Sequence, residues 1–100
     1  MYIAMSPSDL LEQNRDEILR LAARYGATDV RVFGSVARGE AHEGSDVDFL
    51  VRMEPGRSIF DLAALVAELE ALLGRPVDVV PDDAIYWLLR RRILSEAQPL

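Results

Sequence analysis

Two aspartates, Asp46 and Asp48, alternate with apolar residues in the segment "SDVDFLV". In a β-strand, residues two apart point to the same side, so we expect both carboxylates on one face while their apolar neighbours enter the core. Carboxylates that share a site repel each other, and either the pKa of one rises or a cation binds. Oxygen ligands favour Mg²⁺, which takes one or two carboxylates together with substrate phosphates. The alternative interpretation is a solvated strand edge.

A third aspartate and a glycine-serine turn extend this pattern. Asp78 stands among β-branched residues in "PVDVV", where a strand disfavours an acid. Gly34 and Ser35 follow an apolar strand and precede a short helical turn, which would present backbone N–H groups and a hydroxyl to an anion. An ordinary turn would explain this pair alone. If the strand of Asp78 lies beside that of the other acids, however, the set forms a two-metal phosphoryl-transfer site.

Two groups of basic residues have more than one interpretation. Arg38 follows the Gly-Ser turn closely, so its guanidinium would reach a phosphate bound there. A salt bridge to Glu40 or Glu43 is the alternative. The arginine run 90–92 lies late in the last predicted helix, where the negative helix end favours cations, and docking of a partner is its alternative role.

The elements that position these residues alternate between helix and strand. A helix capped by Ser6 ends at Gly26, and a second helix, capped by Ser58, ends at Gly74. The remaining elements are strands over 28–33, 46–51 and 76–80 and a last helix over 82–97 that begins at Asp82 or Asp83. We therefore expect a single domain over residues 1–100, an α/β or α+β layer with a small three-stranded sheet.

Composition restricts the classes of function. Half of the residues are hydrophobic and 28% are charged, as in an ordinary globular chain. The net charge of −6 disfavours direct nucleic-acid binding, which depends on lysine and arginine. The absence of cysteine excludes disulfides and thiolate metal sites. We expect no membrane span and no secretory signal, which makes the cytoplasm the default location.

The segment "GSVARGEAHEGSDVDFLV" resembles the signature of the DNA polymerase beta-like nucleotidyltransferase superfamily, a Gly-Ser pair followed after a spacer by Asp-hydrophobic-Asp. More closely, the chain resembles the minimal nucleotidyltransferases (MNT), antitoxins encoded beside HEPN-domain toxins. The resemblance implies a nucleotidyltransferase fold, in which helices flank a small mixed β-sheet.

The resemblance also implies roles for particular residues. One group, Gly34, Ser35 and Arg38, would hold the nucleoside triphosphate. A second group, Asp46, Asp48 and Asp78, would bind Mg²⁺ and catalyse the reaction, with the third acid helping to deprotonate the attacking hydroxyl.

The function that the resemblance implies is transfer of AMP from ATP to a tyrosine hydroxyl on a partner HEPN toxin, which is thereby silenced. Two alternatives stay open: an antitoxin that neutralises its toxin by binding alone, and a nucleotidyltransferase that acts on RNA or a small molecule. The oligomeric state, a homodimer or a hetero-oligomer, also stays open.

Overall fold

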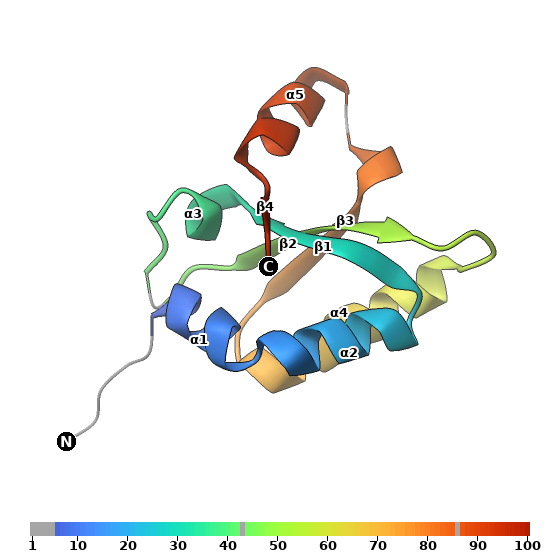
Figure 1. The fold of residues 1–100 in the computed structure, drawn as a ribbon, viewed down its shortest axis with the longest axis horizontal. Helices are drawn as coiled ribbons and strands as arrows, with labels where there is room; N and C mark the ends of the chain where they lie inside the picture. The colour runs from blue at the N-terminus through green and yellow to red at the C-terminus, as the bar shows by residue number, and fades with distance from the viewer. Residues whose placement is uncertain (1–5, 43, 86) are drawn as a thin grey trace.

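A computed structural model describes residues 6–42, 44–85 and 87–100 of the chain. Its centre is one mixed sheet with the strand order β3-β2-β1-β4 (Figure 1). The strands are β1 (Ala27–Phe33), β2 (Val47–Met53), β3 (Val77–Pro81) and β4 (Gln98–Pro99). β1 is antiparallel to both β2 and β4, whereas β2 and β3 are parallel, so the expected small mixed sheet is confirmed.

Helices lie on both faces of this sheet. They are α1 (Pro7–Gln13), α2 (Arg15–Arg24), α3 (Gly34–Ala37), α4 (Ile59–Leu73) and α5 (Trp87–Glu96), with a short 3₁₀ helix η1 (Asp82–Ala84). Figure 1 shows α1, α2 and α4 on one face, and η1 and α5 on the other. Within the described ranges, no helix is long and apolar enough to cross a membrane.

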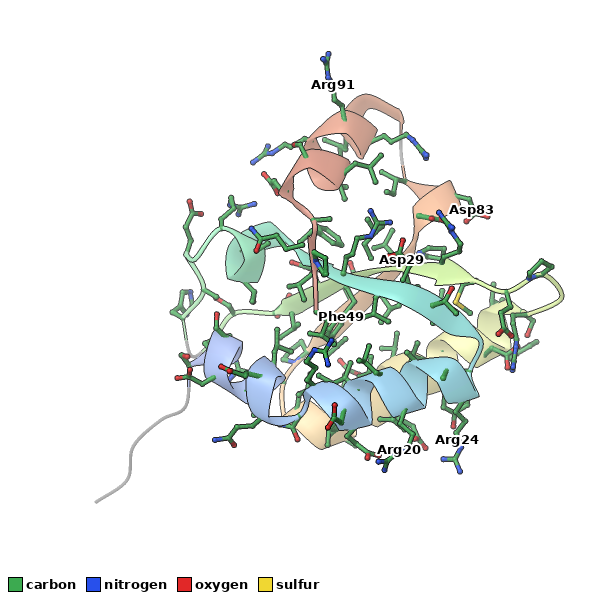
Figure 2. All side chains as sticks on the ribbon, in the orientation of Figure 1. Arg20, Arg24, Asp29, Phe49, Asp83 and Arg91 are labelled. Atoms are coloured by element: carbon green, nitrogen blue, oxygen red, sulfur yellow. The ribbon has the colours of Figure 1, made fainter. Side chains whose placement is uncertain are left out.

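The core forms between β2 and the helices of the first face. Val47, Phe49 and Val51 are fully buried, as the period of two along a strand predicts. Figure 2 shows Phe49 between the sheet and the helices of this face. The residues that alternate with these three, Asp48, Leu50 and Arg52, point to the second face, where Leu50 is buried and Asp48 is half-buried. The period of two therefore places the chemistry of β2 on the side of the sheet that carries α5.

The first predicted helix is two helices. The Ser6 cap is confirmed, because the backbone N–H of Asp9 donates to its hydroxyl at 3.2 Å. At Asn14, however, the helix is interrupted, and the side-chain amide of Asn14 donates to the Leu10 carbonyl at 2.8 Å. Asparagine competes with the helix in this way by bonding to nearby backbone groups.

The C-terminal region also differs from the prediction. The helix capped by Asp82 or Asp83 is wrong, because these residues form η1 and Ile85 has extended backbone before α5 begins. The arginine run 90–92 lies in the middle of α5 and not at its negative end. The three-stranded sheet is also wrong: β4 adds a fourth strand of two residues, too short to show any alternation.

The second helix begins and ends where the sequence indicates. In α4, the Ser58 hydroxyl accepts from the Phe60 backbone N–H at 3.2 Å, and the Asp61 carboxylate accepts from the Ser58 N–H at 3.0 Å. This reciprocal capping box satisfies backbone donors that a helix start would otherwise leave unpaired. Gly74 ends the helix with a φ of 67°, a conformation that suits glycine.

We expect Asp61→Asn to lower the melting temperature by a few degrees at neutral pH. The hydrogen bond from the Ser58 backbone N–H, assisted by nearby Arg57 and opposed by burial, lowers the pKa of Asp61 below 3.8. The ionised Asp61 carboxylate therefore stabilises the fold fully above the unfolded-state pKa, and this stabilisation is lost as the pH falls through the lower folded-state pKa. Melting curves across this range, with exposed Glu12→Gln as control, measure the effect; a difference independent of pH would contradict it.

Candidate active site

The three candidate acids lie at the same end of two neighbouring strands. Asp48 of β2 is in direct register with Asp78 of β3 in their parallel pairing. Residues in register on adjacent strands point to the same face of a sheet, so these two side chains are neighbours. Asp46 immediately precedes β2, not within it as expected, and is exposed like Asp78. The structure therefore brings Asp48 and Asp78 side by side on the face opposite the main core, with Asp46 near enough for its charge to act on Asp48.

Asp48 is at the centre of this electrostatic arrangement. Burial raises the pKa of its carboxyl, and the charges of Asp78 and then Asp46 raise it further, while the positive charge of Arg38 acts in the opposite direction. Proximity of like charges is the expected sign of carboxylates that share a site. Asp48 is thus the acid whose negative charge a bound cation would relieve most.

Gly34 lies on the other side of Asp48. The register of β1 with β2 pairs Phe33 with Asp48, and Gly34 follows directly as the first residue of α3. A Cβ atom at Gly34 would overlap Oδ2 of Asp48 and lie 3.3 Å from its Cγ, and the backbone φ of Gly34 is +74°. Only glycine suits both the close approach and this conformation. Ser35 is half-buried on the same short helix.

Arg38 forms ion pairs that the sequence indicates only in part. Its Nε donates to Glu40 at 3.1 Å, which confirms the salt-bridge interpretation for that partner, while Glu43 lies outside the described residues. Its Nη1 donates to Glu96 of α5, also at 3.1 Å. The guanidinium still acts on the pKa of Asp48, so it lies at the border of the site. Its contact with a phosphate stays a prediction.

Backbone contacts hold the loop that carries Asp46. The N–H of Ser45 donates to the carbonyl of His42 at 2.9 Å, and the N–H of Val47 donates to that of Pro76 at 3.1 Å. Nη1 of Arg75 donates to the Ser45 carbonyl at 3.5 Å. Sequence reasoning missed Arg75, because no local pattern indicates a partner thirty positions away.

The donor set fits a metal that is shared with a substrate. Across the residues with described placement, no three acidic, histidine or cysteine side chains are gathered closely enough to hold one ion. The acids thus do not form a closed cage like those that proteins build for Ca²⁺. Mg²⁺ needs only one or two carboxylates when phosphates complete its coordination, and the raised pKa of Asp48 marks a carboxylate suited to that role. Coordination by all three acids stays a prediction.

A mixed sheet with neighbouring acids on β2 and β3, beside a glycine that begins a short helix, is an arrangement suited to the transfer of phosphorylated groups. The family model of the nucleotidyltransferase domain matches residues 13–100. The chain therefore belongs to the nucleotidyltransferase domain family, and the resemblance to minimal nucleotidyltransferases is confirmed.

Two proteins of similar sequence are named as protein adenylyltransferases. A provisionally named protein adenylyltransferase of Methanocaldococcus jannaschii is 40% identical over 87 residues, which are 87% of this chain and 94% of the relative. Protein adenylyltransferase MntA of Thermococcus cleftensis is 42% identical over 76 residues, with 76% and 77% of the two chains covered.

Solved structures share the fold. A structure provisionally described as a minimal nucleotidyltransferase is 52% identical, with a TM-score of 0.81 and coverage of 90% of this chain and 92% of the other. A second structure contains a tri-AMPylated Shewanella oneidensis HEPN toxin in complex with an MNT antitoxin. At 18% identity, a TM-score of 0.67 and coverage of 88% and 69%, it shows likeness of fold alone.

Proposed function

We propose that this protein is a Mg²⁺-dependent protein adenylyltransferase that transfers AMP from ATP to a tyrosine hydroxyl of a HEPN-domain toxin and so acts as an antitoxin. The observation that carries the proposal is the position of Asp48, in register with Asp78 on one side and against Gly34 on the other. This arrangement supports the proposal because carboxylates that would bind a metal lie next to the turn that would hold the phosphates.

The turn at Gly34 and Ser35 would bind the triphosphate. The backbone N–H groups at the start of α3 would donate to phosphate oxygens, and the Ser35 hydroxyl would add another donor. The missing Cβ of Gly34 leaves room for the Asp48 carboxylate directly beside this turn. Arg38 would supply positive charge from the end of the same short helix. These groups would orient the α-phosphate toward the acids.

Asp46 and Asp48 would hold Mg²⁺, with Asp78 completing the acidic group. When bound, Mg²⁺ neutralises phosphate charge and makes a coordinated hydroxyl more acidic. The protein's own part is to hold Asp48 at a fixed position between two strands, which keeps the reacting groups in line.

The transfer of AMP would form one phosphorus–oxygen bond and break another. The acceptor hydroxyl oxygen forms a bond to the α-phosphorus, and the bond from that phosphorus to the bridging oxygen of the β-phosphate breaks. Pyrophosphate leaves with the electron pair, and Asp78 would receive the hydroxyl proton. The product is a phosphodiester between AMP and the acceptor side chain.

Two considerations support a protein acceptor. The relatives of Methanocaldococcus and Thermococcus are named as protein adenylyltransferases, and an MNT antitoxin has been solved with an AMPylated HEPN toxin. The net charge of −6 also disfavours an RNA acceptor, which would be bound largely through lysine and arginine.

ATP labelled at the α-phosphate should label a HEPN toxin supplied as acceptor, whereas ATP labelled at the γ-phosphate should not. Removal of Mg²⁺ with EDTA should reduce incorporation to background, and added Mg²⁺ should restore it, because the acids alone cannot neutralise the triphosphate. Mass spectrometry of the toxin would locate the modified residue. Label on RNA but never on protein would refute the proposed acceptor.

The double variant Asp46→Asn, Asp48→Asn distinguishes catalysis from neutralisation by binding alone. If AMP transfer silences the toxin, this variant should lose both incorporation and protection of cells that express the toxin. Retention of full protection without incorporation would favour masking. Co-purification of the variant with the toxin serves as the control for folding and assembly.

A further inference from the structure

The C-terminal helix α5 reaches the border of the proposed site through one carboxylate, that of Glu96. One of its oxygens, Oε2, accepts from Nη1 of Arg38 at 3.1 Å, and the other, Oε1, accepts from Nε of Arg92 at 3.1 Å. Arg38 and Glu96 are 58 positions apart in sequence, so tertiary structure alone creates this pair. Figure 1 shows α5 on the face of the sheet opposite α2 and α4, and the alternation along β2 directs Asp48 to this face.

Of the two carboxylates that bind Arg38, Glu96 is the less exposed and the more constrained. Its side chain is 20% exposed, against 65% for Glu40. Arg92, on the preceding turn of α5, fixes the second oxygen of Glu96, and its hydrogen bond is the main cause that lowers the pKa of Glu96. The carboxylate is therefore ionised and anchored to a helix, whereas Glu40 belongs to the exposed segment after α3.

The position of Arg38 links this anchor to the acids. Arg38 caps the end of α3, where its backbone N–H donates to the Gly34 carbonyl at 3.1 Å, and Gly34 itself lies against the Asp48 carboxylate. Among the described residues, its hydrogen bonds to Glu40 and Glu96 use two of the five N–H donors of a guanidinium. The remaining donors give the group capacity to bind an anion while both carboxylates stay attached.

We propose that Glu96 is a positioning residue that holds the Arg38 guanidinium at the border of the site, so that its free donors meet the triphosphate of the nucleotide. This inference rests on the proposed function. It adds to the Gly-Ser and aspartate motifs a residue from α5, a helix that contains none of them.

Glu96→Gln should raise the KM for ATP about 3- to 10-fold while kcat changes less than about twofold, because one partly exposed charge-assisted bond is lost and no reacting group is removed. ATP binding without the acceptor, measured by calorimetry, should weaken by the same factor. Glu68→Gln is the matched control, since it removes a carboxylate from another inter-helix ion pair, Arg24–Glu68 at 4.0 Å.

A double-mutant cycle tests whether the effect passes through Arg38. In an Arg38→Ala background, Glu96→Gln should have no further effect on ATP affinity. NMR of the Arg38 Nη1 protons, which donate to Glu96, in protein without nucleotide should show faster exchange with solvent in Glu96→Gln than in Glu68→Gln. The Arg38 Nε–H, which donates to Glu40, serves as an internal reference.

The outcomes separate this inference from the proposed function. If the wild-type protein transfers AMP but Glu96→Gln matches the control, or its effect persists without Arg38, the positioning role is refuted and the proposed function stands. Tighter ATP binding by Glu96→Gln would also refute it, because Glu96 would then compete with the nucleotide. If the wild type neither binds ATP nor transfers AMP, the proposed function fails, while the NMR comparison still reports whether Glu96 holds Arg38.

Discussion

Asp48→Asn should reduce AMP transfer by at least about 100- to 1000-fold and should at the same time make the nucleotide-free protein more stable. The loss of activity is expected because Asp48 is the acid in contact with both halves of the site, in register with Asp78 and against Gly34. An amide of nearly the same shape keeps the packing but removes the charge that binds Mg²⁺.

The gain in stability follows from the raised pKa of Asp48. Burial first, then the charges of Asp78 and Asp46, disfavour the ionised carboxyl in the folded protein. The folded state therefore loses stability as the pH rises from the unfolded-state value of 3.8 toward the higher folded-state pKa. Asparagine is neutral at every pH, so the stability difference between variant and wild type should be present at neutral pH and should vanish in acid.

Melting curves at several pH values and the α-phosphate incorporation assay together test this prediction. Asp16→Asn is the control, because its carboxylate is 94% exposed and lies on α2, away from the acids. A variant that is inactive and also less stable at neutral pH would mean that Asp48 has a structural role. A variant that keeps wild-type activity would remove the foundation of the proposed function.

The sequence predicted correctly those helix ends that depend on contacts between residues close together in the chain. Ser58 and Asp61 bond to backbone groups within three residues, and Gly74 ends the helix through its own backbone conformation, so the sequence is sufficient to place α4. The face of Asp48 was predictable for the same reason, since alternation along one strand decides it. Asn14 shows the limit of such signals, because a single side-chain bond divides an otherwise helical segment.

Local sequence patterns could not predict that the site residues come together, because their contacts join segments that are distant in the sequence. The parallel register that pairs Asp48 with Asp78 depends on how α4 returns the chain to the sheet. The contact of Glu96 with Arg38 depends on α5, whose start the sequence misplaced. Family resemblance indicated the acids, but neither it nor the local pattern indicated Glu96 or Arg75.

Gly34→Ala should abolish most AMP transfer, about 100-fold or more, with a stability loss no larger than that of an alanine at another left-handed glycine. The backbone φ of +74° makes alanine unfavourable at this position by about 1–2 kcal/mol, whatever surrounds it. The nearest atom to the added Cβ is Oδ2, at the end of the Asp48 side chain, which can rotate away. The fold therefore tolerates the change, but the carboxylate leaves the place where the site needs it.

Gly56→Ala is the matched control for this variant. Gly56 has a φ of +86°, and a Cβ there would meet nothing within 4 Å, so its substitution carries the backbone strain without the contact with Asp48. We expect both variants to lose similar stability in urea unfolding and only Gly34→Ala to lose incorporation and ATP binding. If both keep wild-type activity, the close approach of Gly34 to Asp48 has no role in catalysis; if both lose it equally, backbone strain and not this approach is responsible.

A double variant tests whether the effect of Gly34→Ala passes through Asp48. Adding Asp48→Asn to the Gly34→Ala protein should reduce activity little further, because the first change has already displaced the same carboxylate.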